Sequence, residues 1–130
     1  WGVSSSKQSD MEQNQTSLVL RIYLSNTDKY EEGLLYEHIV LKAKEENLSG
    51  ATVLKGILGY GSSSVIHSYK FWELGEKLPV VIEIIDSEGK VMHFIERIKP
   101  ALDSVRYGCL VTTEKISIIH QKRGKKRGLG

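Results

Sequence analysis

The residues best suited to bind a ligand lie in one glycine- and serine-rich segment, residues 56–67 (GILGYGSSSVIH). Glycines let a backbone come close to an anion, and successive amide groups in a turn can form an anion-binding concavity. Consecutive serine hydroxyls would add hydrogen-bond donors, and a lysine and a histidine at the ends would add charge. The candidate ligand-binding residues are Lys55, Gly56, Gly59, Gly61, Ser62, Ser63, Ser64 and His67.

The same segment also suits a hairpin connection that needs small residues for steric reasons alone. It contains no GK[ST] sequence, and a strand rather than a helix is expected to follow it. A Walker loop and a dinucleotide-binding fingerprint are therefore excluded. Judged by pattern alone, the structural connection is the favoured interpretation.

Metal binding and catalysis find less support in the sequence. The histidines at positions 38, 67, 93 and 120 have no HxH or HxxxH spacing, so a metal site within one chain is not expected. His38 and His93 fall on predicted helices and are expected at the surface. No GxSxG nucleophile elbow is present, and we expect no enzymatic activity.

The single cysteine, Cys109, excludes an intramolecular disulfide and favours a reducing compartment. It stands in an apolar strand pattern, which predicts a packed thiol rather than a nucleophile. Glu83 alternates with Val81 and Ile85 on one face of another apolar strand. It is interpreted either as a hydrogen-bonded carboxylate at the seam between subunits of an oligomer or as an acid that faces a ligand. The position at the seam is the favoured interpretation.

The chain carries patterns typical of both strands and helices. Branched and aromatic residues predict strands at residues 18–24, 51–58, 68–74, 80–85 and 109–119. Apolar residues at helical spacing predict helices at 35–47 and after Asp86 or Ser87, either of which could cap the second helix. Pro100 should kink that helix or end it near Lys99. Gly56 predicts a bulge, or a point where a backbone or ligand comes close.

The order strand, helix, strand, strand, helix, strand predicts an α+β fold of the ferredoxin-like βαββαβ type. Right-handed crossovers then give a four-stranded antiparallel sheet with both helices on one face. The other face would carry apolar residues that nothing in this chain covers, which predicts a homo-oligomer.

Composition bounds the remaining possibilities. The 130 residues suit one domain, divided into a disordered leader (1–17), the domain itself (18–119) and a basic flexible tail (120–130). Of the 18 Lys and Arg, five lie in the tail, which leaves 13 against 16 Asp and Glu, a net charge of −3. A mildly acidic body argues against nucleic-acid binding. No apolar run reaches the roughly 18 residues of a membrane span, so we expect a soluble cytoplasmic or organellar protein without membrane insertion.

Three runs of sequence carry a resemblance to a known family: RIYLSNTDKY, LLYEHIVLKAKEENLSGATVLKGILGYGSSSVIHS and LPVVIEIIDSEGKVMHFI. They resemble the PII-like family known as domain of unknown function 190, and the similarity spans residues 18–119. Its most specific part is GATVLKGILGYG with the following histidine. Ser25 and Asn26 stand where a Gly-Glu pair is common in the family.

The resemblance implies a homotrimer that binds a small anionic effector between subunits, with an adenine nucleotide as the candidate. The glycine segment would then contact phosphate, and Arg106, Tyr107 and Gly108 would occupy the position of another ligand-contacting loop. A regulated partner, such as a membrane transport protein, is a further implication. A trimeric metal-binding protein of the same topology remains the alternative.

Overall fold

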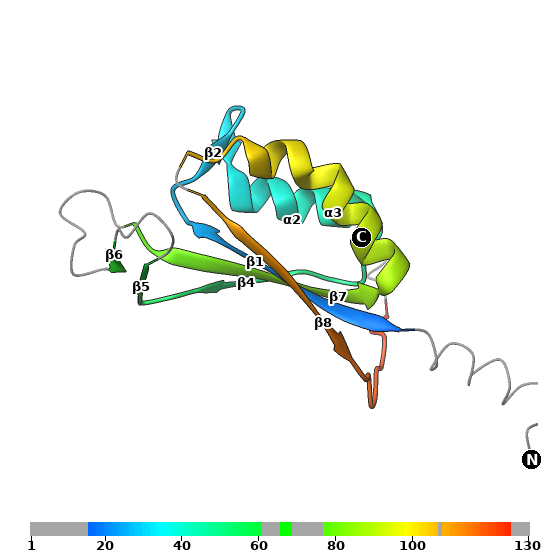
Figure 1. Cartoon of the computed structure of the whole chain (residues 1–130). Coiled ribbons are helices and arrows are strands. Elements are labelled where there is room, and N and C mark those ends of the chain that lie inside the picture. The colour runs from blue at the N-terminus through cyan, green and yellow to red at the C-terminus, as the bar shows by residue number, and fades with distance from the viewer. Residues whose placement is uncertain (1–15, 61–65, 69–76, 107, 126–130) are drawn as a thin grey trace, which may run out of the picture.

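The main structural unit is a four-stranded antiparallel sheet with two helices on one face (Figure 1). The computed structural model describes residues 16–60, 66–68, 77–106 and 108–125. The strand order in the sheet is β4-β7-β1-β8. The strands are β1 (Ser17–Ser25), β4 (Thr52–Lys55), β7 (Pro79–Ser87) and β8 (Leu110–Ile116), and the helices are α2 (Leu35–Glu45) and α3 (Glu88–Asp103).

Two short hairpins complete the described part. One joins β2 (Lys29–Tyr30) to β3 (Gly33–Leu34) just before α2. The other joins β5 (Leu58–Tyr60) to β6 (Ile66–Ser68) and projects beyond the end of the main sheet (Figure 1). This second hairpin contains much of the predicted ligand-binding segment.

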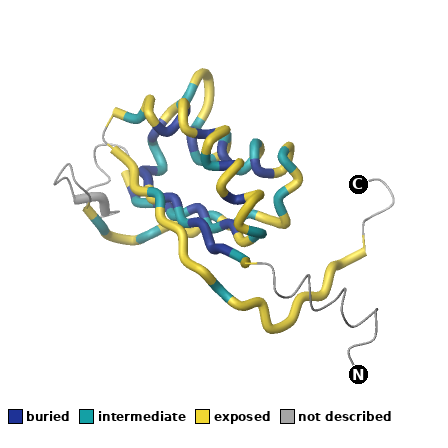
Figure 2. The backbone as a smooth tube through the Cα atoms, turned by 45° about the vertical axis from the view of Figure 1, so that its right-hand side comes forward, coloured by how far each residue is buried: buried dark blue, intermediate teal, exposed yellow. Residues whose placement is uncertain are grey.

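The core lies between the sheet and the helices, where Figure 2 shows most of the buried backbone. Side chains alternate between the faces of a strand, so every second residue of β1 and β7 points toward the helices. Apolar residues of α2 and α3 recur at helical spacing and meet them. The fully buried side chains of the core are Leu20, Ile22, Leu35, Ile39, Ile82, Ile84, Val91, Phe94 and Ile98.

The predicted order of elements is confirmed for the main sheet, whose third strand in the chain is β7. The strand predicted at residues 68–74 lies almost wholly outside the described residues, and Ser68 is the last residue of β6. The strand predicted at residues 51–58 is divided in the structure, because β4 ends at Lys55 and β5 begins at Leu58, with Gly56 between them.

The expected end of the second helix near Lys99 is wrong, since α3 continues through Pro100 to Asp103. Ala101 and Leu102, beyond the proline, are buried in the core, and their packing stabilises the last turn. The hydroxyl of Ser104 then donates a hydrogen bond to the Ala101 carbonyl at 2.6 Å. The backbone bond that the proline removes is outweighed by tertiary contacts.

The predicted side-chain cap of α3 is also wrong. Ser87 occupies the N-cap position, but its side chain makes no capping hydrogen bond. The carboxylate of Asp86 accepts hydrogen bonds from the Ser87 amide at 2.7 Å and from the Ser49 amide at 2.9 Å. Asp86 therefore ties the end of β7 to the loop that follows α2.

Candidate functional site

The β5–β6 hairpin meets the main sheet at one proline. An added Cβ at Gly56 would lie 2.8 Å from Pro79 Cγ, and one at Gly59 would lie 3.2 Å from the same atom. The Gly56 amide also donates a hydrogen bond to the Pro79 carbonyl at 2.7 Å. The predicted close approach at Gly56 is therefore confirmed, and the neighbour is the backbone and ring of Pro79. This packing favours glycine at both positions, and most strongly at Gly56.

The turn after β1 holds Pro79 in place from the other side. The Asn26 amide donates to the Leu78 carbonyl at 2.9 Å, and the Leu78 amide donates to Asn26 Oδ1 at the same distance. The buried Asp28 carboxylate accepts a hydrogen bond from the Ser25 amide at 2.9 Å. Asn26 thus fixes the chain just before β7, and the Ser25–Asp28 bond closes the turn itself.

Lys55 is the candidate binding residue that the structure describes most fully. It is the last residue of β4, it is exposed, and no hydrogen bond or ion pair joins its side chain to the described part of the chain. Its position is directly before the Gly56–Pro79 contact. The ammonium group is thus free to attract an anion at the base of the hairpin.

The other candidates are only partly placed. His67 lies in β6 opposite Gly59 of β5, and only its backbone is described. Gly61, Ser62, Ser63 and Ser64 lie outside the described residues. Lys55, Gly56, Gly59 and the backbone of His67 are therefore brought to one hairpin, while a site that includes the serines stays a prediction.

The face of the main sheet opposite the helices, called here the open face, is arranged in cross-strand rows. The strand register aligns Leu54, Val81, Tyr23 and Leu110 in one apolar row across all four strands. The next row, Thr52, Glu83, Arg21 and Thr112, is polar. Leu54 is 51% exposed and Leu110 is 57% exposed, so the apolar row is accessible to a partner.

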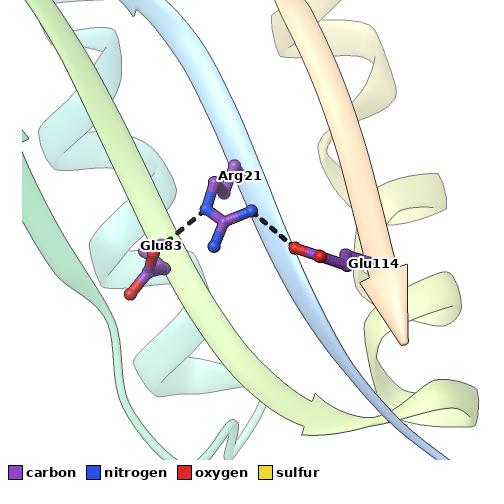
Figure 3. A network of polar contacts seen from close by, with 3 residues as sticks. All are labelled: Arg21, Glu83 and Glu114. Carbon is purple, nitrogen blue, oxygen red and sulfur yellow. Dashed lines mark hydrogen bonds and ion pairs between the residues drawn. The ribbon is translucent and has the colours of Figure 1, made fainter. Parts of the chain in front are cut away.

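Arg21 links two carboxylates on the open face (Figure 3). Its Nε lies 3.1 Å from Glu83 Oε2, and one terminal nitrogen lies 3.0 Å from Glu114 Oε1. The hydrogen bonds to Glu114 and Glu83 raise the pKa of Arg21, which stays protonated. Glu83 is thus a sheet carboxylate paired within its own chain, and its position at an oligomer seam stays a prediction. Two acids and one base leave an excess negative charge in this part of the open face.

The segment after β8, residues 117–125, is called here the C-terminal arm. It has neither helix nor strand in its described residues, and it runs clear of the helices and sheet (Figure 2). Between the arm and the end of β7 lies an open groove of about 820 Å³. Glu83 and Ile85 line it on the sheet side, and Ile118, His120 and Arg123 line it on the arm side.

Cys109 does not lie where the sequence predicts. It precedes β8 and is exposed, so the expectation of a packed thiol inside a strand is wrong. Its Sγ lies 3.9 Å from the Leu102 carbonyl oxygen, which is the distance of a weak hydrogen bond. Partial desolvation, together with the negative charges of Asp28 and Asp103, raises the pKa of the thiol. A raised pKa lowers the thiolate fraction, which disfavours nucleophilic catalysis.

The histidines do not converge on a metal site within the described residues. His93 is exposed, as expected, and its Nε2 lies 3.6 Å from Glu46 Oε1, while His38 is half-buried against the ring of Tyr30 at 4.6 Å between centroids. No group of three or more His, Cys, Asp or Glu in the described ranges is arranged to hold a metal ion. Nor has any helix of that part the length and apolar content needed to cross a membrane.

The fold is that of PII-like proteins. The chain aligns with the structure of CPII from Thiomonas intermedia K12 bound to ADP, AMP and acetate with a TM-score of 0.58 and 15% identity, over 82% of this chain and 91% of that one. A second structure of CPII, described as a nitrogen regulatory PII-like protein bound to ADP, AMP and bicarbonate, gives a TM-score of 0.56 and 18% identity over 82% of this chain and 97% of that one.

The chain belongs to the family DUF190 (Uncharacterized ACR), whose model matches residues 17–118. A UPF0166 protein of Aquifex aeolicus is 38% identical over 78% of this chain and 92% of its own length. A UPF0166 protein of Methanocaldococcus jannaschii is 41% identical over 74% of this chain and 86% of its own length. The resemblance seen in the sequence is therefore confirmed.

Two structural residues escaped the sequence analysis. Arg21 is the one charged residue in the run LVLRIYL, and that interruption was the available signal for a polar row on the open face. Pro79 was identified only as a strand start, although it also anchors the hairpin. Its contact with Gly56 joins segments that are distant in sequence, so no local pattern could predict it.

Proposed function

We propose that this chain is a PII-like regulatory protein that binds a small anionic effector between the subunits of a homotrimer. The adenine nucleotides are the favoured effectors. The protein acts by binding rather than by catalysis, and ligand binding changes the β5–β6 hairpin, which a regulated partner then contacts. A membrane transport protein is one class of such a partner.

The observation that carries the proposal is an exposed, unpaired Lys55 at the base of a glycine-rich hairpin on a PII-like fold. CPII, which shares this fold, was solved with ADP and AMP, and this supports an adenine nucleotide as the ligand. A lysine ammonium supplies a point charge suited to phosphate. Gly56 and Gly59, by contrast, are explained by Pro79, and their role is to position the hairpin.

Assembly follows from the open face. An apolar row that crosses all four strands and stays accessible is typical of a protein interface. The polar row beside it would fix the register between copies. Packing of open faces around a threefold axis would bring the hairpin of one subunit beside the next subunit.

The first test is a thermal-shift and calorimetric screen of the purified protein against ATP, ADP, AMP, cyclic nucleotides, phosphate and divalent metals. A nucleotide at a hundredfold its dissociation constant should add about 2.7 kcal/mol of stability. The mass in solution is measured in parallel by light scattering. Absence of any shift in melting temperature would contradict the proposed effector binding, and a monomeric mass would contradict the proposed trimer.

The second test asks whether the nucleotide binds at the hairpin or at another part of the surface. Lys55→Glu should weaken nucleotide binding at least tenfold, because it replaces an attractive charge with a repulsive one. Lys44→Glu, on the exposed surface of α2, makes the same change in net charge and should leave binding unchanged. Gly61→Val tests the segment beyond Tyr60 and should abolish binding without changing the oligomer. Equal nucleotide affinities in all three variants would show that the nucleotide binds at another part of the protein.

A further inference from the structure

Most of the described C-terminal arm is exposed. Ile119 is 92% exposed, and residues 120–125 are exposed as well. Within the described residues, no hydrogen bond or ion pair joins the arm to the sheet or the helices. Ordering such a segment costs conformational entropy, so contacts from another molecule would stabilise it.

The charge of the arm is opposite to that of the open face. The arm contains Lys122, Arg123 and Lys125 and no acidic residue. On the open face, Glu83 and Glu114 share the single base Arg21, which leaves one carboxylate charge unbalanced. Opposite charges of this kind steer association and fix register between partners.

The apolar content of the arm also matches the open face. Ile118 and Ile119 are both exposed at the start of the arm. The open face offers exposed side chains of the apolar row, with Leu54 at one edge and Leu110 at the other. Burial of these groups against each other would remove apolar surface from water on both sides.

The arm stands across a groove from the end of its own sheet. The arm and the end of β7 line the two sides of this groove, which is open and has a volume of about 820 Å³. The exposed residues of the arm are therefore accessible to a neighbouring molecule.

From these observations we propose that the arm of one copy lies on the open face of a second copy of this chain. Lys122 and Arg123 would stand beside Glu83 and Glu114, and Ile119 would contact the apolar row. The inference rests on the proposed homo-oligomer and goes beyond it by naming the segment and the charges that join the copies.

The first experiment reverses the charge of the arm in the full chain. K122E/R123E should weaken self-association at least tenfold in sedimentation experiments. K44E/K99E, on exposed positions of the helix layer, makes the same change in net charge and should associate like the wild type. Melting temperatures of the diluted proteins check that the subunits remain folded.

The second experiment distinguishes an arm that reaches a second copy from one that acts within its own chain. E114K alone should also associate weakly, because its open face repels the basic arm. Mixing E114K with K122E/R123E should give stronger association than either variant alone, since two of the three arm–face contacts in a mixed trimer then pair opposite charges from different chains. Only a contact between molecules can be rescued by mixing.

The outcomes separate the inference from the proposed function. Stronger association in the mixture than in either variant alone supports the inference. Unchanged association of K122E/R123E overturns it and leaves the trimer and its effector intact. Association of the mixture no stronger than that of either variant alone, combined with recovery in the single chain E114K/K122E/R123E, overturns it in favour of a contact within one subunit. A monomeric wild type overturns both the inference and the proposed assembly.

Discussion

The two faces of the main sheet are made from alternate residues of the same strands, yet they differ in what covers them. Toward the helices, β1 contributes Leu20 and Ile22, both fully buried. Toward the open side, the same strand contributes Arg21 and the 39% exposed Tyr23. Helices α2 and α3 of the same chain cover the first face, and no helix of the described part covers the second.

This difference indicates that stability and function are separated across the sheet. The covered face supplies the burial that folds a chain of this size. The open face keeps apolar and charged groups available for a partner, and its rows run across all four strands without interruption. Substitutions on the two faces should therefore change different measurements.

The largest effect is expected on the covered face, from Phe94→Ala. Phe94 is fully buried between α3 and the sheet, and its removal should cost about 3–5 kcal/mol of unfolding free energy. Urea denaturation at fixed protein and ligand concentration measures the loss. A change below about 1 kcal/mol would mean that this face is less well packed than the structure shows.

A smaller loss is expected where the hairpin meets the sheet, from Gly56→Ala. The new methyl group would stand 2.8 Å from Pro79 Cγ, and overpacking of this kind costs about 1–3 kcal/mol. The matched control is Gly89→Ala in the first turn of α3, where nothing lies within 4 Å of the added Cβ. The control should be stabilised by up to about 1 kcal/mol because alanine favours helix. Equal effects in both variants would contradict the anchoring role of Pro79.

On the open face, Leu54→Ser and Leu110→Ser should separate folding from association. Both side chains are more than half exposed, so each change should alter the unfolding free energy of the isolated subunit by about 1 kcal/mol or less. Self-association, measured by sedimentation, should weaken at least tenfold because the apolar row is interrupted. Normal association in both variants would show that the subunits join through another surface.

The smallest effect concerns Cys109, at the edge of the sheet. Its raised pKa should make alkylation by iodoacetamide at pH 8 slower in the folded protein than in the urea-unfolded chain. Asp103→Asn removes one of the charges that raise the pKa and should shift the pH–rate profile to lower pH. Glu96→Gln, an exposed change in the same helix, is the control. Identical profiles for the folded and unfolded protein would contradict the shift.

The fold was largely predictable, because local patterns carry most of it. The branched and aromatic residues of β1 and the helical spacing in α3 are local features, and the strand and the helix that they predict are confirmed. The end of α3 was not predictable, because Pro100 argues locally for a stop while Ala101 and Leu102 are held by the core. Tertiary packing there outweighs local preference.

The candidate site was predictable only in part. The glycine and serine content located the segment, and Lys55 stands where that prediction put it. The sequence left open whether the glycines serve a ligand or the packing, and the contact of Gly56 and Gly59 with Pro79 now gives them a structural role. The position of Cys109 was mispredicted because an apolar strand pattern says nothing about whether a strand edge is covered.

By itself, the sequence determined the order of the elements, the apolar faces that must be buried and the family. Each of these depends on residue types and on their spacing along short stretches of the chain. Only the tertiary structure decided which residues meet across strands. The Arg21 network, the apolar row from Leu54 to Leu110 and the Gly56–Pro79 contact all join residues far apart in the chain. Their physical basis is strand register, which aligns side chains across the sheet and depends on the packing of the whole domain.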